Sequence, residues 1–326
     1  MNVPLSRRGF LRKSVEVPLV ATVLTAGVAG IPGNKPLLVD ASTELNPARP
    51  NTSPNICLFS KHLQFLNYDE MADTCVELGL EGIDLTVRLG GHVTPENLDR
   101  DFERAVRTIR DTGLEVPMIT TRLTEANDEA DTLLAAAAEL GIPFLRIGGH
   151  RYNEYEAVSL QIERITEELQ ALTELAGNYH VNLGYHNHSG YGYYGGPVWD
   201  LLHTYRSIGL PNIGSNLDLG HVTVEGAYGA GMVIVRLLAE MNRVHMIALK
   251  DFVWEGSRPR WLTLGEGYVP TAEYLKVLHA HGFSGPVSLH FEYNTGTESE
   301  LLEEIRKSVA LLKVWLAEAG YSAPSS

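Results

Sequence analysis

Residues 128–149, DEADTLLAAAAELGIPFLRIGG, show the pattern that decides the fold. Apolar residues recur at helical spacing up to Leu140, Gly141 stands where a helix C-terminus is expected, and a short apolar strand follows. The same order repeats along the chain, with strands predicted to begin near Asn55, Leu80, Leu114, Ile142, His180, Asn212, Val244 and Gly285. Eight strands alternating with helices over roughly 270 residues predict an α/β fold, a single-domain (β/α)8 TIM barrel.

A doubly wound open sheet is the structural alternative to this barrel. A dinucleotide-binding version of that sheet would need a GxGxxG motif between a strand and a helix. Gly265-Glu-Gly267 lies in a predicted loop and lacks this context. The helices that support the barrel are predicted at residues 69–78, 95–112, 128–140 and 157–176.

The N-terminus carries a predicted export signal. Ser6-Arg-Arg-Gly-Phe-Leu-Arg-Lys-Ser14 has the paired arginines of a twin-arginine signal, and the apolar run 17–29 that follows is too short for a membrane span. We therefore divide the chain into a signal peptide (1–29), a flexible leader (30–54), the barrel (55–318) and a C-terminal tail (319–326). This organisation predicts a periplasmic or secreted protein.

Charge and cysteine content restrict the partners. Removing residues 1–29 takes away four basic residues and one acidic residue, so the formal charge moves from −14 to −17. A surface this acidic disfavours nucleic acid as a partner, and it disfavours anionic membranes once the signal peptide is removed. Homo-oligomerisation stays possible. Cys57 and Cys75 are better explained as two buried small side chains than as a disulfide.

Polar side chains gather at the ends of the later predicted strands. In a strand, residues i and i+2 face the same way, so His186 and His188 share a face, as do His290 and Glu292. In a (β/α)8 barrel the active site lies at the carboxyl ends of the strands. Similar strand-end positions in the first half of the chain, of which at most half are expected to line the pocket, hold Lys61, His62, Asp84, Arg88, His92, Arg146 and His150.

The residue types suggest roles for these side chains. Asp218 is the strongest single candidate, because a carboxylate at a strand end needs a cation or hydrogen-bond donors. We interpret His186, Asp218, His290 and Glu292 as metal ligands, and Lys250, His188 and Glu292 as catalytic groups. Lys250 is the favoured general base, and the alternative is a binding group or a surface pair with Asp251. The candidate substrate-binding residues are His221, Asp251, His150 and Trp254.

Two aromatic segments are candidates for contacts with a sugar face. The tract Gly190-Tyr-Gly-Tyr-Tyr-Gly-Gly196 follows the fifth predicted strand, and Trp254 and Trp261 follow the seventh. Their rings can stack on the apolar face of a sugar. Plain surface loops with buried aromatic residues are the alternative interpretation.

The chain resembles the xylose isomerase-like TIM-barrel superfamily of sugar (phosphate) isomerases and epimerases over roughly residues 55–318. The motifs that carry the resemblance are Tyr185-His-Asn-His188, Asp218-Leu-Gly-His221, Leu249-Lys-Asp251, Gly265-Glu-Gly267 and Val287-Ser-Leu-His-Phe-Glu292. The resemblance implies one divalent metal ion held by Glu, Asp, His and Glu from successive strands. Those four positions correspond to His186, Asp218, Ala248 and His290, with Glu292 two residues further on.

Three of the four ligand positions depart from the family pattern. Replacing carboxylates by imidazoles softens the site, so Zn²⁺, Fe²⁺ or Mn²⁺ is favoured over Mg²⁺ as the cofactor. The same replacements remove the glutamate pair that the family's epimerases use as acid and base. Ala248 offers no ligand atom at all.

These observations predict an exported, metal-dependent isomerase or epimerase that acts next to a carbonyl of a sugar or polyol. The metal would polarise two substrate oxygens during proton abstraction. The first alternative is a lyase or hydrolase of a keto-sugar. The second is a sugar-binding barrel without catalysis. Ala248 favours this alternative, and it is opposed by Asp218, His186, Lys250 and Glu292.

Overall fold

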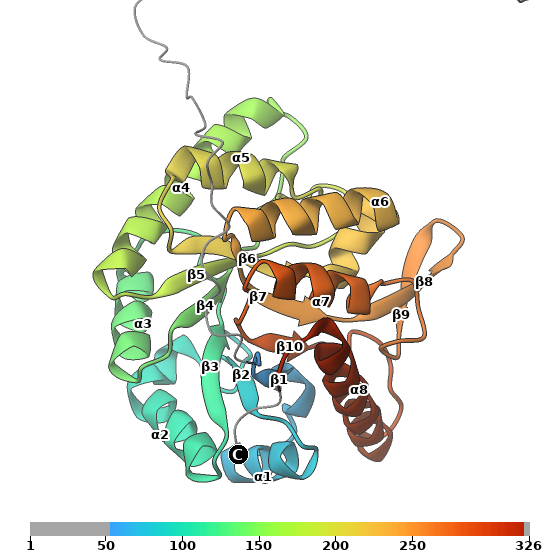
Figure 1. The fold of residues 1–326 in the computed structure, drawn as a ribbon. Coiled ribbons are helices and arrows are strands. Elements are labelled where there is room, and N and C mark those ends of the chain that lie inside the picture. The colour runs from blue at the N-terminus through green and yellow to red at the C-terminus, as the bar shows by residue number, and fades with distance from the viewer. Residues whose placement is uncertain (1–52, 323–326) are drawn as a thin grey trace, which may run out of the picture. The chain divides into compact units, whose positions relative to one another are not determined.

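The computed structural model describes residues 53–322. The predicted signal peptide and nearly all of the predicted leader lie outside the described residues. Eight parallel strands form a closed barrel, each paired with its neighbours and the last with the first (Figure 1). In chain order they are β1 (Ile56–Phe59), β2 (Gly82–Thr86), β3 (Glu115–Thr120), β4 (Phe144–Ile147), β5 (Asn182–His186), β6 (Ile213–Asp218), β7 (Val244–Leu249) and β10 (Val287–Leu289). The predicted (β/α)8 barrel is confirmed.

The helices surround these strands (Figure 1). They are α1 (Tyr68–Glu77), α2 (Leu98–Asp111), α3 (Asp128–Glu139), α4 (Val158–Asn178), α5 (Trp199–Ile208), α6 (Leu219–Glu240), α7 (Thr271–Ala280) and α8 (Glu298–Ala319), with short 3-10 turns η1 (Ser60–Leu63) and η2 (Pro95–Asn97). Capping boxes begin two of them: Asn67 and Glu70 at α1, and Thr297 and Glu300 at α8. Each box satisfies backbone N–H groups that the first helical turn leaves free.

Left-handed residues end most of the helices. Gly141 follows α3 with φ 65°, and Asn242 takes the same role after α6 with φ 54°. A side chain with a Cβ is strained in this conformation, so glycine and asparagine are favoured there. The chain can then turn sharply from each helix into the next strand, which is the local reason for the repeated pattern.

The helix-facing side of the barrel wall is apolar. Leu58, Ile83 and Leu145 are fully buried between strands and helices, and each such side chain contributes about 1.5–3 kcal/mol relative to leaving it exposed. Cys57 and Cys75 are unpaired and buried, and burial raises the pKa of Cys75 to about 12. They behave as small core side chains.

A two-stranded hairpin interrupts the simple alternation. The chain passes from β7 directly into β8 (Asp251–Glu255) and returns as the antiparallel β9 (Arg258–Leu262) (Figure 1). Gly256, with φ 62°, lies in the turn between them. The sequence predicts a loop for this segment, whereas the structure has a hairpin. The hairpin decides where Asp251, Trp254 and Trp261 lie.

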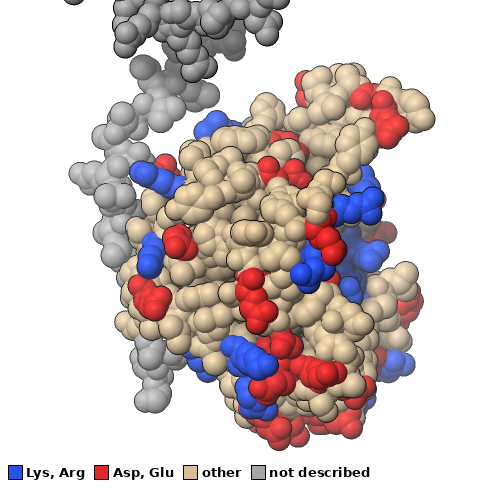
Figure 2. Space-filling view, turned by 90° about the vertical axis from the view of Figure 1, so that its right-hand side faces the viewer, with Lys and Arg blue, Asp and Glu red and all other residues tan. Residues whose placement is uncertain are grey.

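The longest apolar helix belongs to the barrel wall. α6 is long and apolar enough by composition to cross a membrane. Its helical backbone is interrupted at Ala227 (φ 48°, ψ −163°), and it packs on β6, β7 and α7. On the face shown in Figure 2, lysine and arginine side chains lie among acidic ones and form no continuous basic surface.

Candidate active site

Four strand ends bring polar side chains to one end of the barrel. His186 is the last residue of β5, and Asp218 is the last residue of β6. Lys250 follows β7, and His290 follows β10. The carboxyl ends of the strands open to the same end of a barrel, here called the mouth. In the strand register Asp218 lies beside Ala248, so the missing family ligand is missing from the mouth itself.

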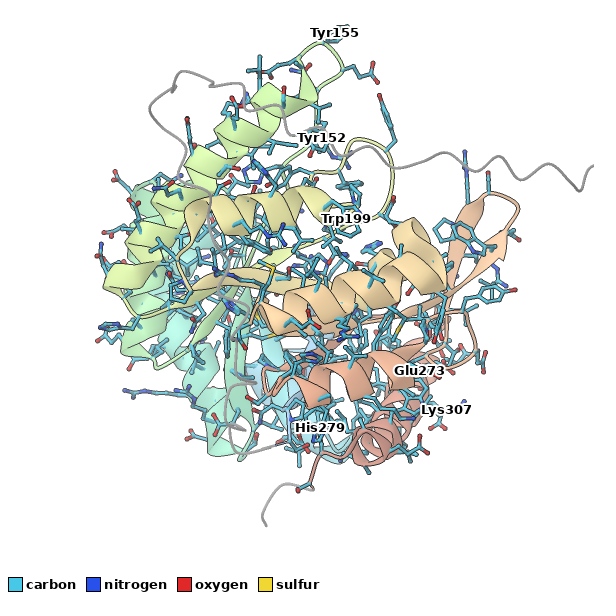
Figure 3. All side chains as sticks on the ribbon, turned by 45° about the horizontal axis from the view of Figure 1, so that its top comes forward. Tyr152, Tyr155, Trp199, Glu273, His279 and Lys307 are labelled. Atoms are coloured by element: carbon cyan, nitrogen blue, oxygen red, sulfur yellow. The ribbon has the colours of Figure 1, made fainter. Side chains whose placement is uncertain are left out.

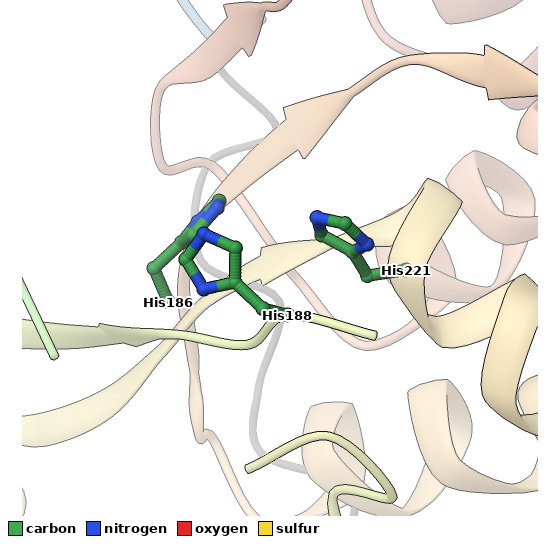
Figure 4. Close-up of side chains that lie close together, drawn as sticks. All are labelled: His186, His188 and His221. Atoms are coloured by element: carbon green, nitrogen blue, oxygen red, sulfur yellow. The ribbon is translucent and has the colours of Figure 1, made fainter. Parts of the chain in front are cut away.

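The mouth contains two groups of possible metal ligands. Ligand atoms of His186, Asp218 and His290 all lie within 4.8 Å of one another. His186, His188 and His221 form a second group within the same limit. Figure 4 shows the rings of His186 and His188 side by side, with His221 reaching toward them from the start of α6. His186 is common to both groups.

The first group fits a cation, because its buried polar atoms lack hydrogen-bond partners. Both ring nitrogens of His186 and of His290 are buried and make no hydrogen bond with another described residue. Burial lowers the pKa of both histidines well below 6.5, so both are neutral, the form that binds metal. Asp218 Oδ2 is also buried without a well-aligned hydrogen bond. Buried polar groups are normally satisfied, so these atoms fit a metal ion.

Asp218 has a second, structural task. Its Oδ1 accepts a hydrogen bond from the His221 backbone N–H at 2.9 Å, which caps the N-terminus of α6. Burial raises the pKa of Asp218, and the charge of Lys250 opposes this rise. One carboxylate oxygen therefore holds the helix, and the other faces His186 at 3.7 Å.

Lys250 is buried at the centre of an ion-pair network. Its Nζ lies 3.1 Å from Asp218 Oδ2 and donates to Glu292 Oε2 at 2.7 Å. It also lies 2.7 Å from His221 Nε2 and 4.4 Å from the centre of the Trp261 ring. Two carboxylates and an aromatic face stabilise a charged ammonium. A general base must be neutral, so these contacts argue against the role that the sequence analysis favoured for Lys250.

Glu292 is turned toward Lys250. Burial alone would raise the pKa of Glu292, but the charge and hydrogen bond of Lys250 more than offset it and lower the pKa to about 2. Glu292 is a carboxylate at neutral pH, and its side chain stays 29% exposed. Its contact with Lys250 supports the predicted catalytic role of Glu292, which stays a prediction. Neither group of possible metal ligands found among the described residues includes Glu292.

His188 and His221 are neutral imidazoles beside this network. Burial, followed by the charges of Arg146 and Lys250, lowers the pKa of His188 to about 4. Burial and Lys250 lower the pKa of His221 well below 6.5. Since an ammonium only donates, His221 Nε2 accepts from Lys250, and Nδ1 donates to Ser189 Oγ at 2.7 Å. His188 has no such ties and remains partly exposed, so it is the freer proton acceptor.

Asp251, predicted to bind substrate, is tied to the backbone in this structure. Its carboxylate accepts backbone N–H bonds from Phe252, Gly265, Gly267 and Val269, at 2.8–3.0 Å. A Cβ on Gly267 would lie 2.2 Å from this carboxylate, so glycine is required there. Asp251 organises the loop that follows the hairpin.

The structure also places Trp254 and His150 away from the mouth. Trp254 is 45% exposed on the hairpin and contacts Phe252, whereas Trp261 meets the His221 ring edge-on at 5.0 Å. His150 stacks on Tyr185 and lies 3.3 Å from Glu168. These contacts of Trp254 and His150 therefore lie outside the Lys250 network, and the predicted substrate contacts of both residues stay predictions. Trp261 is the tryptophan that contacts Lys250 and His221.

The aromatic tract after β5 contributes one ring to the mouth. Tyr193 stacks on His188 with ring centres 5.2 Å apart, and the Arg151 guanidinium lies over the Tyr193 ring, 3.8 Å from its centre. Figure 3 shows Tyr155 at the outer end of the loop before α4, where it is 97% exposed, and Trp199 at the start of α5. Only part of the loop surface therefore touches the site.

The first four strands supply a different set. Phe59 stacks on His290 at 4.6 Å, and the guanidinium groups of Arg88 and Arg146 lie near its ring. His62 Nε2 accepts the Phe291 backbone N–H at 3.0 Å. Lys61 is exposed, and His92 is held by Thr86 and the Leu63 carbonyl. Phe59 was missed because an apolar strand residue carries no sequence signal for a site.

A closed (β/α)8 barrel with a buried, histidine-rich mouth is the class of protein that this fold and site define. The chain belongs to the xylose isomerase-like TIM barrel family, whose model matches residues 72–315. The family expected from the sequence is therefore confirmed. No curated protein matches the sequence.

Solved structures of similar fold include an L-ribulose 3-epimerase with 17% identity and a TM-score of 0.64, covering 82% of this chain and 95% of that chain. The IOLI protein with a bound zinc atom has 14% identity and a TM-score of 0.66, with coverage of 82% and 99%. A xylose isomerase-like barrel from Mycobacterium smegmatis in complex with magnesium has 16% identity and a TM-score of 0.63, with coverage of 82% and 98%. At these identities the likeness shows the fold.

Proposed function

We propose that this protein is a metal-dependent isomerase or epimerase that moves a proton next to a carbonyl of a sugar or polyol. The observation that carries the proposal is the group of buried ligand atoms on His186, Asp218 and His290 within 4.8 Å of one another. Among the described residues both imidazoles lack hydrogen-bond partners, and Asp218 Oδ2 forms an ion pair with Lys250 at 3.1 Å. Family membership and the likeness to an L-ribulose 3-epimerase support the substrate class. The zinc and magnesium in two similar structures support a divalent ion.

His186, Asp218 and His290 would hold the ion, with His188 in reach as a further ligand. A divalent ion at this position would polarise substrate oxygens and acidify the neighbouring C–H. Two imidazoles and one carboxylate form a softer donor set than carboxylates alone, and this favours Zn²⁺, Fe²⁺ or Mn²⁺ over Mg²⁺. Ala248 offers no ligand atom, and the nearby Lys250 adds a fixed positive charge to the site.

The protein's own residues divide the proton chemistry between them. His188 is neutral at pH 7 and partly exposed, so its free imidazole nitrogen can accept the proton from substrate carbon. Lys250, held by Asp218 and Glu292, stabilises the negative charge that develops on the substrate oxygen. The Trp261 ring lies against Lys250, and the Tyr193 ring stacks on His188.

A lyase that eliminates water is the second candidate, and Lys250 favours it. An ammonium that already donates to Glu292 and His221 can also donate a proton to a leaving hydroxyl group. Both reactions begin with the same proton abstraction next to a carbonyl. They differ in the product, because only the lyase loses a water molecule.

The decisive experiment combines metal analysis with NMR. The purified protein is expected to hold close to one divalent ion per chain and to exchange substrate C–H for deuterium in D2O across a panel of keto and aldo sugars. A product of unchanged composition identifies an isomerase if the carbonyl has moved to the neighbouring carbon and an epimerase if one stereocentre is inverted, whereas a dehydrated product identifies the lyase. Full activity after metal removal would refute the proposal. A metal-free protein that binds sugars without exchange would establish a non-catalytic barrel.

A further inference from the structure

Two arginine side chains lie near the Phe59 ring on the β1–β4 side of the mouth. Arg146 comes from β4 and Arg88 follows β2, and their guanidinium carbons lie 5.3 Å and 5.5 Å from the centre of the Phe59 ring. Arg146 is 7% exposed. Its Nη1 is buried without a hydrogen-bond partner. Within residues 53–322, neither guanidinium has a carboxylate oxygen within 4.0 Å.

Among the carboxylates, Asp84 has the strongest electrostatic influence on Arg146, but it compensates the positive charge of Arg146 only in part. The Asp84 oxygens accept hydrogen bonds from Thr120 Oγ1 at 2.7 Å and Ser288 Oγ at 2.8 Å. Burial raises the pKa of Asp84 despite these bonds and the charge of Arg146. Burial lowers the pKa of Arg146 to about 10, so the guanidinium stays charged at neutral pH.

An unpaired buried charge is costly, and proteins normally pair it. Lys250, in the same mouth, shows the usual solution, because it contacts both Asp218 and Glu292. Arg146 has five donors and no such partner among the described residues. The missing partner must be an anion, and the planar guanidinium suits the paired oxygens of a carboxylate or phosphate.

We propose that Arg146 and Arg88 form a subsite for an oxyanion on the substrate, the carboxylate of a sugar acid or the phosphate of a sugar phosphate. This inference rests on the proposed function, because the subsite holds one end of the substrate while the mouth acts on the other. Phe59 joins the two regions: its ring contacts both guanidinium groups and stacks on His290. Arg88 is only half buried, which leaves this side open for entry.

The test measures binding by calorimetry on the full, purified protein with D-glucose, D-glucuronate and D-glucose 6-phosphate as probes. We expect at least one of the two anions to bind about tenfold or more tightly than glucose. A preference for glucuronate assigns a carboxylate, and a preference for glucose 6-phosphate assigns a phosphate. Equal binding of all three probes would overturn the inference.

Arginine variants separate this subsite from direct binding of the anion to a metal ion. Arg88→Met is expected to reduce the preference about tenfold while glucose binding holds. Arg107→Met is the matched control, since Arg107 is 74% exposed on α2 and pairs with Glu103. An anion preference that survives Arg88→Met unchanged would overturn the inference.

Arg146→Met adds a readout that a structural role would not give. If Arg146 serves the substrate, its apolar replacement removes an unpaired buried charge, so the Tm holds or rises while the anion preference is lost. If Arg146 serves the fold by balancing Asp84, the Tm falls and Arg88→Met leaves the preference intact. Metal-dependent deuterium exchange on neutral sugars with no anion preference would leave the proposed function standing and remove only this inference.

Discussion

The two halves of the barrel mouth treat charge in opposite ways. On the side of β5 to β10, Lys250 is paired with two carboxylates, and the histidines around it are neutral. On the side of β1 to β4, no carboxylate of the described part of the chain lies within 4.0 Å of the Arg146 or Arg88 guanidinium. The first arrangement is balanced within the protein and suits a metal ion and a proton. The second is balanced only when an anion arrives.

One end of the barrel can therefore carry the proton chemistry on one side and bind the substrate on the other. The halves meet at the pairing of β4 with β5 and at the pairing of β1 with β10, where the barrel closes. The second junction carries the contacts of the Phe59 and His62 side chains. There Phe59 stacks on His290, and His62 accepts the Phe291 backbone N–H. Each of the following predictions changes one side of this arrangement or its junction.

Asp218→Asn is expected to have the largest effect. Asparagine keeps an oxygen for the His221 N–H and so preserves the cap of α6, but it removes the charge that faces His186 and Lys250. Bound metal should be lost, and turnover should fall by about 10³-fold or more. Elemental analysis and the deuterium-exchange assay measure both effects.

Asp200→Asn is the matched control for a buried aspartate. Asp200 lies on α5 and bonds Tyr152 and the Gly195 N–H, away from the metal ligands. Its variant is expected to retain metal even if stability falls. If Asp218→Asn retained metal and turnover, the β5–β10 side of the mouth would not be the catalytic side.

Lys250→Met tests the ion-pair network at the next level of effect. Because the ammonium stabilises charge that develops in the transition state, kcat should fall about 10²-fold while KM changes little. Lys250→Arg should not restore kcat, since a planar guanidinium does not fit the contacts of a compact ammonium. A raised KM with an unchanged kcat would make Lys250 a binding group.

A loss of stability could also lower the activity of Lys250→Met, and a double variant controls for this. Removing the lysine leaves Asp218 and Glu292 without their counter-charge, which costs about 3–5 kcal/mol for a buried pair. Lys250→Met with Glu292→Gln should recover part of the stability but none of the turnover. Recovery of both would assign the network to the fold.

The sequence predicted the fold well because its signals are local. Helical periodicity and left-handed residues such as Gly141 mark each helix end, and they depend on neighbours within one turn. The β8–β9 hairpin was missed because Pro259 stands inside β9, and proline normally argues against a strand. Here the proline lies in a two-stranded ribbon outside the barrel.

The site could be predicted only where strand parity fixes a direction. Parity correctly faced His186, Lys250 and His290 into the mouth. It could not show that Asp251 accepts N–H bonds from residues 14–18 positions later, because those contacts depend on how the loop folds back. Nor could strand parity show that no described carboxylate contacts Arg146, because this depends on the side chains of all neighbouring strands.

The smallest expected effect concerns the junction of the two halves, where His62 makes stability depend on pH. Burial lowers the pKa of His62 from 6.5 to about 4. Between these values the unfolded chain binds a proton that the folded protein does not, so stability is present above pH 6.5 and is lost as pH falls toward 4. His62→Gln keeps an acceptor for the Phe291 N–H without titrating. From pH 7 to pH 5, denaturant unfolding should show about 1–2 kcal/mol more loss for the wild type than for His62→Gln. His203→Gln, on the exposed side of α5, should follow the wild type. Parallel curves for His62→Gln and the wild type would mean that His62 is free to take a proton, and that the two halves are not joined through the Phe291 N–H.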